Sequence, residues 1–317
     1  MTDHLRHGLQ ESLGLSDCLL NRLIQRAPHS YKIYTIAKRT GGQRTIAQPA
    51  KETKFIQRWL IQNIFNKLPV HECASAYKDG ASIKKNANAH KNHSYVIKLD
   101  FKDFFPSITF SDLVKHIAKH LGHILRTQDI QDIARISCIR LHGKSDLCLS
   151  VGAPSSPVLS NTIMYNFDSE VSAWCTQQCI TYTRYADDLT FSTNFKGGSS
   201  EIEAFVRSIT QKLTYPSLRL NNNKTTHLSK KHQRRITGII INNEGNLSLG
   251  RNRKREICAL IHKFSLDLLP ESEIFRLQGL IGFAKDVEPL FVARMRGKYS
   301  SKLIEEVLQK RKPGRLC

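Results

Sequence analysis

The sequence predicts an α+β fold, in which an antiparallel sheet packs against helices and a basic helical region follows. The sheet is indicated by residues 182–193, which read as a strand, a tight turn at Ala186-Asp187-Asp188 and a second strand. The helical region is indicated from Arg251 onward, where the pattern is helical and basic. Strands and helices arranged in this way are typical of a sheet-bearing core with a helical appendage.

Length and composition limit the class of protein. The 317 residues suffice for two or three subdomains, and 40% hydrophobic with 24% charged residues is typical of a globular protein. Lys and Arg number 48 against 27 Asp and Glu, a net charge of +21 that predicts a polyanionic partner, usually nucleic acid. The sequence contains no run of about 18 apolar residues and begins with polar residues, so we expect a cytoplasmic protein without a membrane partner.

The first part of the chain is expected to form helices and a short hairpin. Residues 9–27 have helical spacing and end before Pro28, while residues 31–36 alternate like a strand. Residues 38–44 form a basic, glycine-containing turn before a second short strand. Apolar residues then recur at helical spacing over residues 51–68.

The central part is expected to contain further helices and strands. The expected elements are a strand over Tyr95–Asp100, a helix capped by Ser111 and ending at Gly122, helices over 158–175 and 201–213, and a short hairpin of 235–241 and 247–249.

Cysteine and histidine patterns argue against a structural metal. None of the eight cysteines pairs with CxxC spacing, so neither a zinc knuckle nor a disulfide framework is expected. His116, His120 and His123 lie at helical spacing, but no acidic residue stands between them as in HExxH, and lysines interleave. We therefore expect a solvated helix face.

Two acidic sites far apart in the sequence carry the chemical signal. Asp100 ends a strand in LDFKDFFPSI, and Asp187 and Asp188 occupy the turn in YTRYADDLTF. Adjacent carboxylates resist joint ionisation, and a divalent cation removes that cost. Three carboxylates from two strands can hold two Mg²⁺ ions about 3.5–4 Å apart, which suits in-line displacement at phosphorus. An isolated Asp-Asp pair is ordinarily just a solvated turn, so the interpretation depends on the combination.

The combined motifs resemble those of the reverse transcriptases. YADD on a hairpin, after an aspartate that ends a strand, is similar to the palm of that family. The segment KRTGGQRTIAQP at 38–49 resembles the fingers, and GAPSSP at 152–157 resembles the loop that supports template and nucleotide. The resemblance covers about residues 31–302. It implies a right-hand polymerase with fingers, a palm built on an antiparallel sheet with packed helices, and a helical thumb, acting as an RNA-directed DNA polymerase.

The resemblance also implies a metal site. Asp100, Asp187 and Asp188 would be the catalytic residues and, with the backbone carbonyl of Phe101, would bind two Mg²⁺ ions.

The same resemblance implies residues that contact the nucleotide. Arg44 would grip the incoming triphosphate, Gly152 would lie in the supporting loop, and Lys224 in LNNNKT would be a proton donor to the departing pyrophosphate. Phe105 stands where the family carries its aromatic steric gate, because a ring beneath the sugar leaves no room for a ribose 2′-OH. The neighbouring Phe101 and Phe104 are expected to be core residues.

Two segments resemble the bacterial retron branch of the family. NANAH at 86–90 is similar to the retron NAxxH signature, and RITG at 235–238 is similar to the VTG segment that opens the retron thumb. Ile236 replaces the usual valine, and Ser150-Val151 stands where many relatives have Pro-Gln. The chain has room for neither a maturase region nor an RNase H. The expected domains are an N-terminal helical extension at 1–30, fingers at 31–94, a palm at 95–230 with a finger-like helical insertion at about 111–149, and a basic RNA-binding thumb at 231–317.

The basic C-terminal third is the expected RNA-binding region. From Lys224 onward 20 Lys and Arg stand against 9 Asp and Glu, which suits a duplex gripped through phosphates and 2′-OH groups. The candidate RNA-binding residues are Asn86, His90, Thr237, Gly238, Arg251, Arg253, Lys254 and Arg255. The retron resemblance implies a cognate structured non-coding RNA as template and primer, and branched, RNA-linked single-stranded DNA (msDNA) as product. It further implies a retron effector protein in anti-phage defence, and host RNase H for template removal.

Two rival functions remain at this point. An RNA-dependent RNA polymerase shares the palm, although its turn more usually reads GDD and Phe105 argues against ribonucleotides. A non-enzymatic scaffold that only binds RNA or a toxin partner would have no reason to keep three clustered carboxylates.

Overall fold

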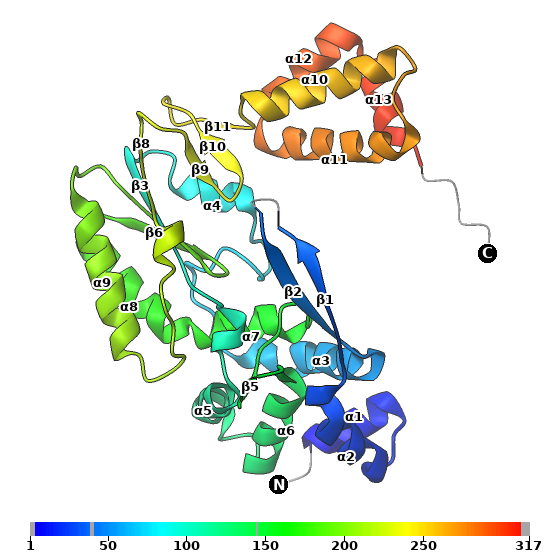
Figure 1. The fold of residues 1–317 in the computed structure, drawn as a ribbon, viewed down its shortest axis with the longest axis vertical. Coiled ribbons are helices and arrows are strands. Elements are labelled where there is room, and N and C mark those ends of the chain that lie inside the picture. Colours follow the sequence, from blue (N-terminus) through cyan, green and yellow to red (C-terminus); the bar gives the residue numbers. More distant parts are fainter. Residues whose placement is uncertain (1–3, 39–40, 144, 312–317) are drawn as a thin grey trace. The chain divides into compact units, whose positions relative to one another are not determined.

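The computed structural model describes residues 4–38, 41–143 and 145–311, which divide into two compact units (Figure 1). The first unit comprises the described residues up to Ala81 and those from Ile97 to His227. The second comprises Ser82–Val96 and the described residues from Leu228 onward, so two distant segments build it. Within these ranges, none of the helices is sufficiently long and apolar to span a lipid bilayer.

The N-terminal part of the first unit consists of three helices and a hairpin. They are α1 (His4–Leu13), α2 (Asp17–Arg26), α3 (Lys51–Asn63), and the antiparallel strands β1 (Tyr31–Ala37) and β2 (Gln43–Pro49). The segment 9–27, which was expected to be helical, contains the end of α1 and all of α2, with a break between them. Gly14 adopts a φ of 64° after α1, and Ser16 then caps α2 by accepting a hydrogen bond from the Leu19 backbone N–H.

A four-stranded sheet in the order β6-β7-β3-β8 carries the predicted acidic residues. Its strands are β3 (Tyr95–Asp100), β6 (Thr181–Tyr185), β7 (Asp188–Thr193) and β8 (Thr226–Ser229). Strands β6 and β7 pair antiparallel with Tyr185 opposite Asp188, which leaves Ala186 and Asp187 as a two-residue turn. Ala186 has a φ of 58°, as tight hairpin turns require. The predicted strand–turn–strand is therefore confirmed.

Five helices and a short hairpin complete the first unit. They are α5 (Phe110–Leu121), α6 (Thr127–Ser137), β4 (Ile139–Arg140), β5 (Leu147–Cys148), α7 (Ser155–Ile163), α8 (Tyr165–Gln177) and α9 (Gly198–Lys212). Helix α8 packs on both α9 and β6 (Figure 1). The predicted helix over 158–175 is two helices that meet at Met164.

The N-cap of α5 is Thr109, not the predicted Ser111. Thr109 Oγ1 accepts a hydrogen bond from Asp112 N at 3.2 Å, and Asp112 Oδ2 accepts one from Thr109 N at 2.9 Å. This reciprocal capping box satisfies two backbone donors, and Ser111 lies inside the first turn.

The end of β3 adjoins the main hydrophobic core of the first unit, which includes Phe101 and Phe104. Phe101 and Phe104, 1% and 2% exposed, stack with ring centroids 5.8 Å apart, which confirms both as core residues. The expected solvated face was wrong for His116, which is 1% exposed and lies against Tyr215. Burial lowers the pKa of His116 to about 3, so the ring is neutral there.

The second unit combines a small sheet with five helices. They are α4 (Ile83–Ala89), β9 (Arg234–Ile236), β10 (Ile239–Ile241), β11 (Leu247–Ser248), α10 (Arg251–Ser265), α11 (Glu271–Val287), α12 (Pro289–Tyr299) and α13 (Ser301–Gln309). The sheet order is β11-β10-β9, and α4 packs on β9 and β10. The buried Arg234 side chain donates hydrogen bonds to the carbonyls of His93 and Asn242, which ties the two chain segments of this unit together.

Candidate active site

The three predicted aspartates converge in the first unit. Asp100 is the last residue of β3, while Asp187 and Asp188 lie at the turn into the neighbouring strand β7. The backbone N–H of Phe101 donates to the carbonyl of Asp187 at 3.2 Å, which holds the turn against the end of β3. Asp100 is only 5% exposed, so the carboxylates meet in a partly desolvated place.

Burial and mutual repulsion disfavour full ionisation of this cluster. Burial raises the pKa of Asp187, and the charge of Asp100 adds to the effect. Burial raises the pKa of Asp188 to about 6, where the Lys98 charge opposes the rise and the two other aspartates increase it. The pattern is that of acids packed more closely than their charges favour, which is typical of functional sites.

Lys224 lies directly on this cluster. Its Nζ donates to Asp100 Oδ1 at 2.8 Å and to Oδ2 at 2.9 Å. Partial burial opposes the charge on Lys224, but the hydrogen bond and the charge of Asp100 raise its pKa overall. The ammonium therefore remains charged and neutralises one carboxylate.

The donor chemistry of the three aspartates fits a hard divalent cation, because such ions prefer carboxylate oxygens. Across residues 4–38, 41–143 and 145–311, however, no group of three or more His, Cys, Asp or Glu side chains is already disposed to hold a metal ion. Lys224 lies against both oxygens of Asp100, so a cation at this residue must share it with the ammonium or replace the ammonium.

The predicted triphosphate residue lies within electrostatic reach of the cluster. Burial is the main influence on the pKa of Asp187, and the charge of Arg44 on β2 acts against it. Strand β2 also packs on the predicted nucleotide loop, because Ala47 N donates to Val151 O at 2.8 Å. Gly152 has a φ of 121°, and a Cβ there would come within 2.9 Å of Ala47 O. Only glycine allows this close approach.

Phe105 begins a short 3-10 turn, Phe105–Ser107, which follows β3 after a connection of four residues. Its ring is partly buried and meets Phe104 edge-on with centroids 5.5 Å apart. The contact with a core residue limits the positions that the Phe105 ring can take.

A buried ion pair beneath the turn was not predicted from the sequence. Arg184 and Asp168 are both fully buried, and Arg184 Nη2 lies 2.6 Å from Asp168 Oδ2. Arg184 Nη1 donates to the carbonyl of Ala186 at 3.1 Å and to Asn161 Oδ1 at 3.2 Å. Tyr182 also donates its hydroxyl to Asp168 at 2.9 Å. Strand periodicity was an available signal for part of this arrangement, because it places Tyr182 and Arg184 on the same buried face of β6.

Tyr77 is a second residue that the sequence analysis missed. It has a φ of 56°, is 44% exposed and packs on Tyr185 with ring centroids 6.5 Å apart. Burial raises the pKa of Tyr77, and the charge of Asp187 adds to the effect, so the phenol lies near the acidic cluster.

Among the predicted RNA-binding residues, Asn86, His90, Thr237 and Gly238 gather in the second unit. Asn86 and His90 are 2% and 0% exposed, and Asn86 Nδ2 donates to Thr237 Oγ1 at 3.5 Å. Thr237 and Gly238 form a turn with φ values of 45° and 88°. Asn86 therefore supports this turn from inside, His90 is buried in the same unit, and Thr237 and Gly238 are the more accessible pair.

The four predicted cations of α10 differ in their surroundings. Arg251 and Arg255 are exposed, whereas the Arg253 guanidinium lies 4.9 Å from the centre of the Phe283 ring. Lys254 Nζ forms an ion pair with Glu288 at 2.6 Å. Arg251 and Arg255 are therefore more available to an external phosphate than Arg253 and Lys254.

Comparisons with known proteins agree with the geometry. The family model described as reverse transcriptase (RNA-dependent DNA polymerase) matches residues 36–241. The chain is 40% identical to the retron Ec83 reverse transcriptase of Escherichia coli, covering 94% of this chain and 95% of that protein. It is 33% identical to the retron Ec73 reverse transcriptase of Escherichia coli, over 87% of this chain and 89% of that protein.

A solved structure supports the fold alone. Apo telomerase from Candida Tropicalis superposes with a TM-score of 0.51 at 14% identity, over 87% of this chain and 60% of that chain. The match agrees with a right-hand polymerase fold of mixed helices and antiparallel strands, as predicted.

The buried pair beneath the turn leads to a test that separates stability from activity. Removing only one partner, as in Asp168→Ala, leaves the Arg184 charge buried and unpaired. We expect this change to lower the free energy of unfolding by about 3–5 kcal/mol. The double replacement Arg184→Met with Asp168→Leu removes both charges, and such replacements are often neutral. It also removes the hydrogen bond to the Ala186 carbonyl. We expect a smaller loss of stability than in Asp168→Ala, because hydrogen bonds are lost but no charge is left buried and unpaired. We expect kcat for nucleotide incorporation to fall about tenfold or more, equal to about 1.4 kcal/mol of barrier.

Tyr182→Phe is the matched control, because it removes one hydrogen bond to Asp168 and leaves Arg184 in place. It should keep near-normal kcat. A double variant with wild-type kcat would show that the pair only fills the core.

Proposed function

This chain belongs to the bacterial retron reverse transcriptases, which are RNA-directed DNA polymerases, and we propose that it copies a structured non-coding RNA into branched, RNA-linked single-stranded DNA. The observation that carries the proposal is the convergence of Asp100, Asp187 and Asp188 at the ends of neighbouring strands. Such a partly buried acidic cluster suits phosphoryl chemistry and serves no purpose in an RNA scaffold.

Reverse transcriptases act with divalent metal ions, and we propose two Mg²⁺ ions here. The two ions, when bound, would activate the primer hydroxyl and stabilise charge on the triphosphate. Asp100, Asp187, Asp188 and the backbone carbonyl of Phe101 would hold them. Burial and crowding favour protonation of Asp187 and Asp188, and neighbouring positive charge favours the ionised forms that can act as ligands.

Lys224 has a role that follows from its contact with Asp100. Its ammonium neutralises Asp100 when the site holds no cation, at 2.8 and 2.9 Å from the two oxygens. When Asp100 serves as a ligand instead, the flexible lysine side chain is released toward the leaving group. A charged ammonium there would donate its proton to the departing pyrophosphate.

The nucleotide would be positioned by residues of three segments. We propose that Arg44 binds the triphosphate, because guanidinium groups bind phosphates through paired hydrogen bonds. Gly152 would support the nucleotide by allowing its loop to lie close against β2. Phe105 would exclude ribonucleotides, since its contact with Phe104 keeps the ring in place beneath the sugar.

We also propose the fingers, palm and thumb boundaries expected from the sequence, at 31–94, 95–230 and 231–317. The second unit joins NANAH at 86–90 to RITG at 235–238, and the contact of Asn86 with Thr237 supports a shared role in RNA recognition. An RNA template is the partner that the family requires. The specific partners that we propose are a cognate structured RNA and its DNA product, an effector protein of an anti-phage system, and host RNase H for template removal.

The proposed function is tested first at the acidic cluster. Asp187→Ala with Asp188→Ala should abolish DNA synthesis, because the metal ligands are lost, and should leave RNA affinity near wild type. Primer extension and RNA binding are measured on the same preparations. Asp146→Ala, at an exposed acid in the loop between β4 and β5, is the control. Extension by the double variant at even a tenth of the wild-type rate, a barrier increase of only about 1.4 kcal/mol, would exclude these two residues as metal ligands.

The second test concerns the sugar. Phe105→Val should raise ribonucleotide incorporation relative to deoxyribonucleotide incorporation, because a steric barrier is removed. Phe110→Val is the matched control, since this ring is also partly buried against the core of the first unit and has no part in the proposed gate. The ratio of kcat/KM for dGTP and GTP decides the question. An unchanged ratio in the Phe105 variant would mean that this ring is a core residue and does not select the sugar.

The third test concerns the basic helix α10. Replacing the exposed Arg251 and Arg255 with Ala should lower the slope of log K against log salt by about 1.4–1.8, if both contact phosphate. Lys196→Ala with Lys212→Ala removes the same charge from exposed positions of the first unit. Equal slopes for the two double variants would mean that α10 provides only general positive charge.

A further inference from the structure

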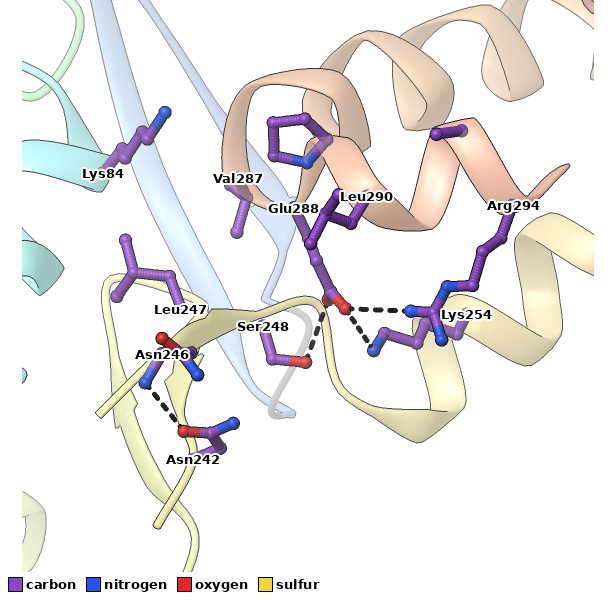
Figure 2. Close-up of a pocket in the computed structure, with 12 residues that line it drawn as sticks. Lys84, Asn242, Asn246, Leu247, Ser248, Lys254, Val287, Glu288, Leu290 and Arg294 are labelled. Carbon is purple, nitrogen blue, oxygen red and sulfur yellow. Dashed lines mark hydrogen bonds and ion pairs between the residues drawn. The ribbon is translucent and has the colours of Figure 1, made fainter. Parts of the chain in front are cut away.

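The second unit contains a pocket that no part of the polymerase mechanism uses. It has a volume of about 900 Å³ and lies between the β10–β11 hairpin and the junction of α11 with α12 (Figure 2). Its lining includes the turn residues Asn242 and Asn246, the helix residues Leu290 and Arg294, and Lys84 from α4. Cavities of this size bind small ligands, and a single nucleotide falls within that range.

The one acidic group of the pocket is already fully engaged. Glu288 accepts hydrogen bonds from Ser248 Oγ at 3.0 Å, Leu249 N at 3.1 Å and Lys254 Nζ at 2.6 Å. Partial burial opposes its charge, but these hydrogen bonds lower the pKa of Glu288 overall. Glu288 therefore holds the pocket wall together and has little capacity left to bind a ligand.

Positive charge remains at the edge of the pocket. The Arg294 side chain is 66% exposed, and its Nη2 lies 3.6 Å from Glu288. The Lys84 side chain is 41% exposed and lies 3.4 Å from Asp286. Both are surface ion pairs, which contribute little and exchange readily for a better anion. The pocket edge thus favours a negatively charged ligand.

The pocket also has an apolar wall and directed amides. Leu290 is 77% exposed, although it is a large aliphatic side chain. On the opposite side, Asn242 Oδ1 accepts from Asn246 N at 2.7 Å and from Glu244 N at 3.1 Å, which fixes the orientation of the Asn242 amide. Figure 2 shows the Asn242 and Asn246 side chains on the hairpin side, with Leu290 and Arg294 on the helix side.

We infer that this pocket binds one unpaired nucleotide of the bound RNA. The base would cover Leu290 and present its edge to the asparagine amides, while Arg294 and Lys84 would meet the flanking phosphates. Proteins read RNA sequence mainly through unpaired bases splayed out of loops and bulges, because the grooves of A-form duplexes hide the base edges. The inference rests on the proposed RNA binding by this unit and adds a position at which base identity is read.

A matched pair of variants tests the pocket. Leu290→Asp places a carboxylate against the base and phosphate, whereas Leu268→Asp makes the same change at a 67% exposed leucine of the same unit outside the pocket. The probe is the RNA that co-purifies with the full-length protein, sequenced and resynthesised, beside a fully paired RNA duplex. Leu290→Asp should weaken binding of the first RNA about tenfold more than Leu268→Asp does, as expected for loss of one base contact. The two variants should bind the duplex alike.

A second measurement identifies the nucleotide. Abasic substitutions are introduced one at a time into the unpaired positions of the RNA and combined with Leu290→Ala, a milder change at an exposed site. At the nucleotide in the pocket, the two losses should not add, because each removes the same contact. Additive losses at every unpaired position would overturn the inference.

The remaining outcomes are also decisive. Equal RNA affinities of Leu290→Asp and Leu268→Asp would exclude a nucleotide here, and loss of a co-purifying protein instead would make the pocket a protein-docking site. The proposed function is tested independently by Arg251→Ala with Arg255→Ala. If that variant weakens RNA binding while Leu290→Asp does not, the pocket inference fails and the proposed RNA binding stands.

Discussion

The repulsion between three aspartates is the constraint around which the first unit is arranged. Asp100, Asp187 and Asp188 meet in a partly desolvated place, where burial and mutual charge raise the pKa of the latter two. Neighbouring side chains offset this repulsion with positive charge. Lys224 neutralises Asp100, and Lys98 and Arg44 offset the other two acids. The arrangement therefore has positive charge already in place before any metal is bound.

A separate set of contacts fixes the geometry of the turn that carries Asp187, because positive charge near the acids does not by itself set the backbone conformation. Arg184 binds the Ala186 carbonyl from below, and Asp168 neutralises Arg184 within the core. Phe101 contributes its ring to that core and its backbone N–H to Asp187, so one residue links core packing to the acidic cluster. A buried ion pair seldom adds much stability, and its attested use is to select one arrangement among several. Here the selected arrangement is the one that keeps the two acids of the turn beside β3.

The sequence allowed the acidic cluster and its strands to be predicted, because short strands with alternating burial and a tight turn are local patterns. Where the pattern was not local, the prediction failed or was absent. The cap of α5 is an exception, because its signal is local: Thr109 rather than Ser111 caps the helix through a reciprocal bond with Asp112, three residues along the chain. His116 is buried because Tyr215, distant in sequence, covers it. The Asp168–Arg184 pair likewise joins a helix to a strand, and no spacing rule reveals such a pair.

The retron-like segments show the same limit for the site. Asn86 and His90 were expected to bind RNA, and the structure places both inside the second unit. Motif resemblance identifies important residues, but it does not distinguish residues that would contact RNA from residues that hold those contacts in place. Burial makes that distinction: Gly238 is exposed and Thr237 is half-buried, so these two are the more accessible residues of the two motifs.

The discontinuous second unit has a consequence for biosynthesis. Its segment Ser82–Val96 leaves the ribosome early, whereas its partners from Leu228 onward follow only after residues 97–227 have been made. Until then Ala87 and Val96, which are 0% exposed in the finished protein, lack the core that covers them. Domains generally fold as units during synthesis, and apolar surface that stays exposed before its partners are made promotes aggregation. The nascent chain thus passes through an interval in which α4 must be shielded or kept unfolded, and the second unit is the last part of the enzyme to mature.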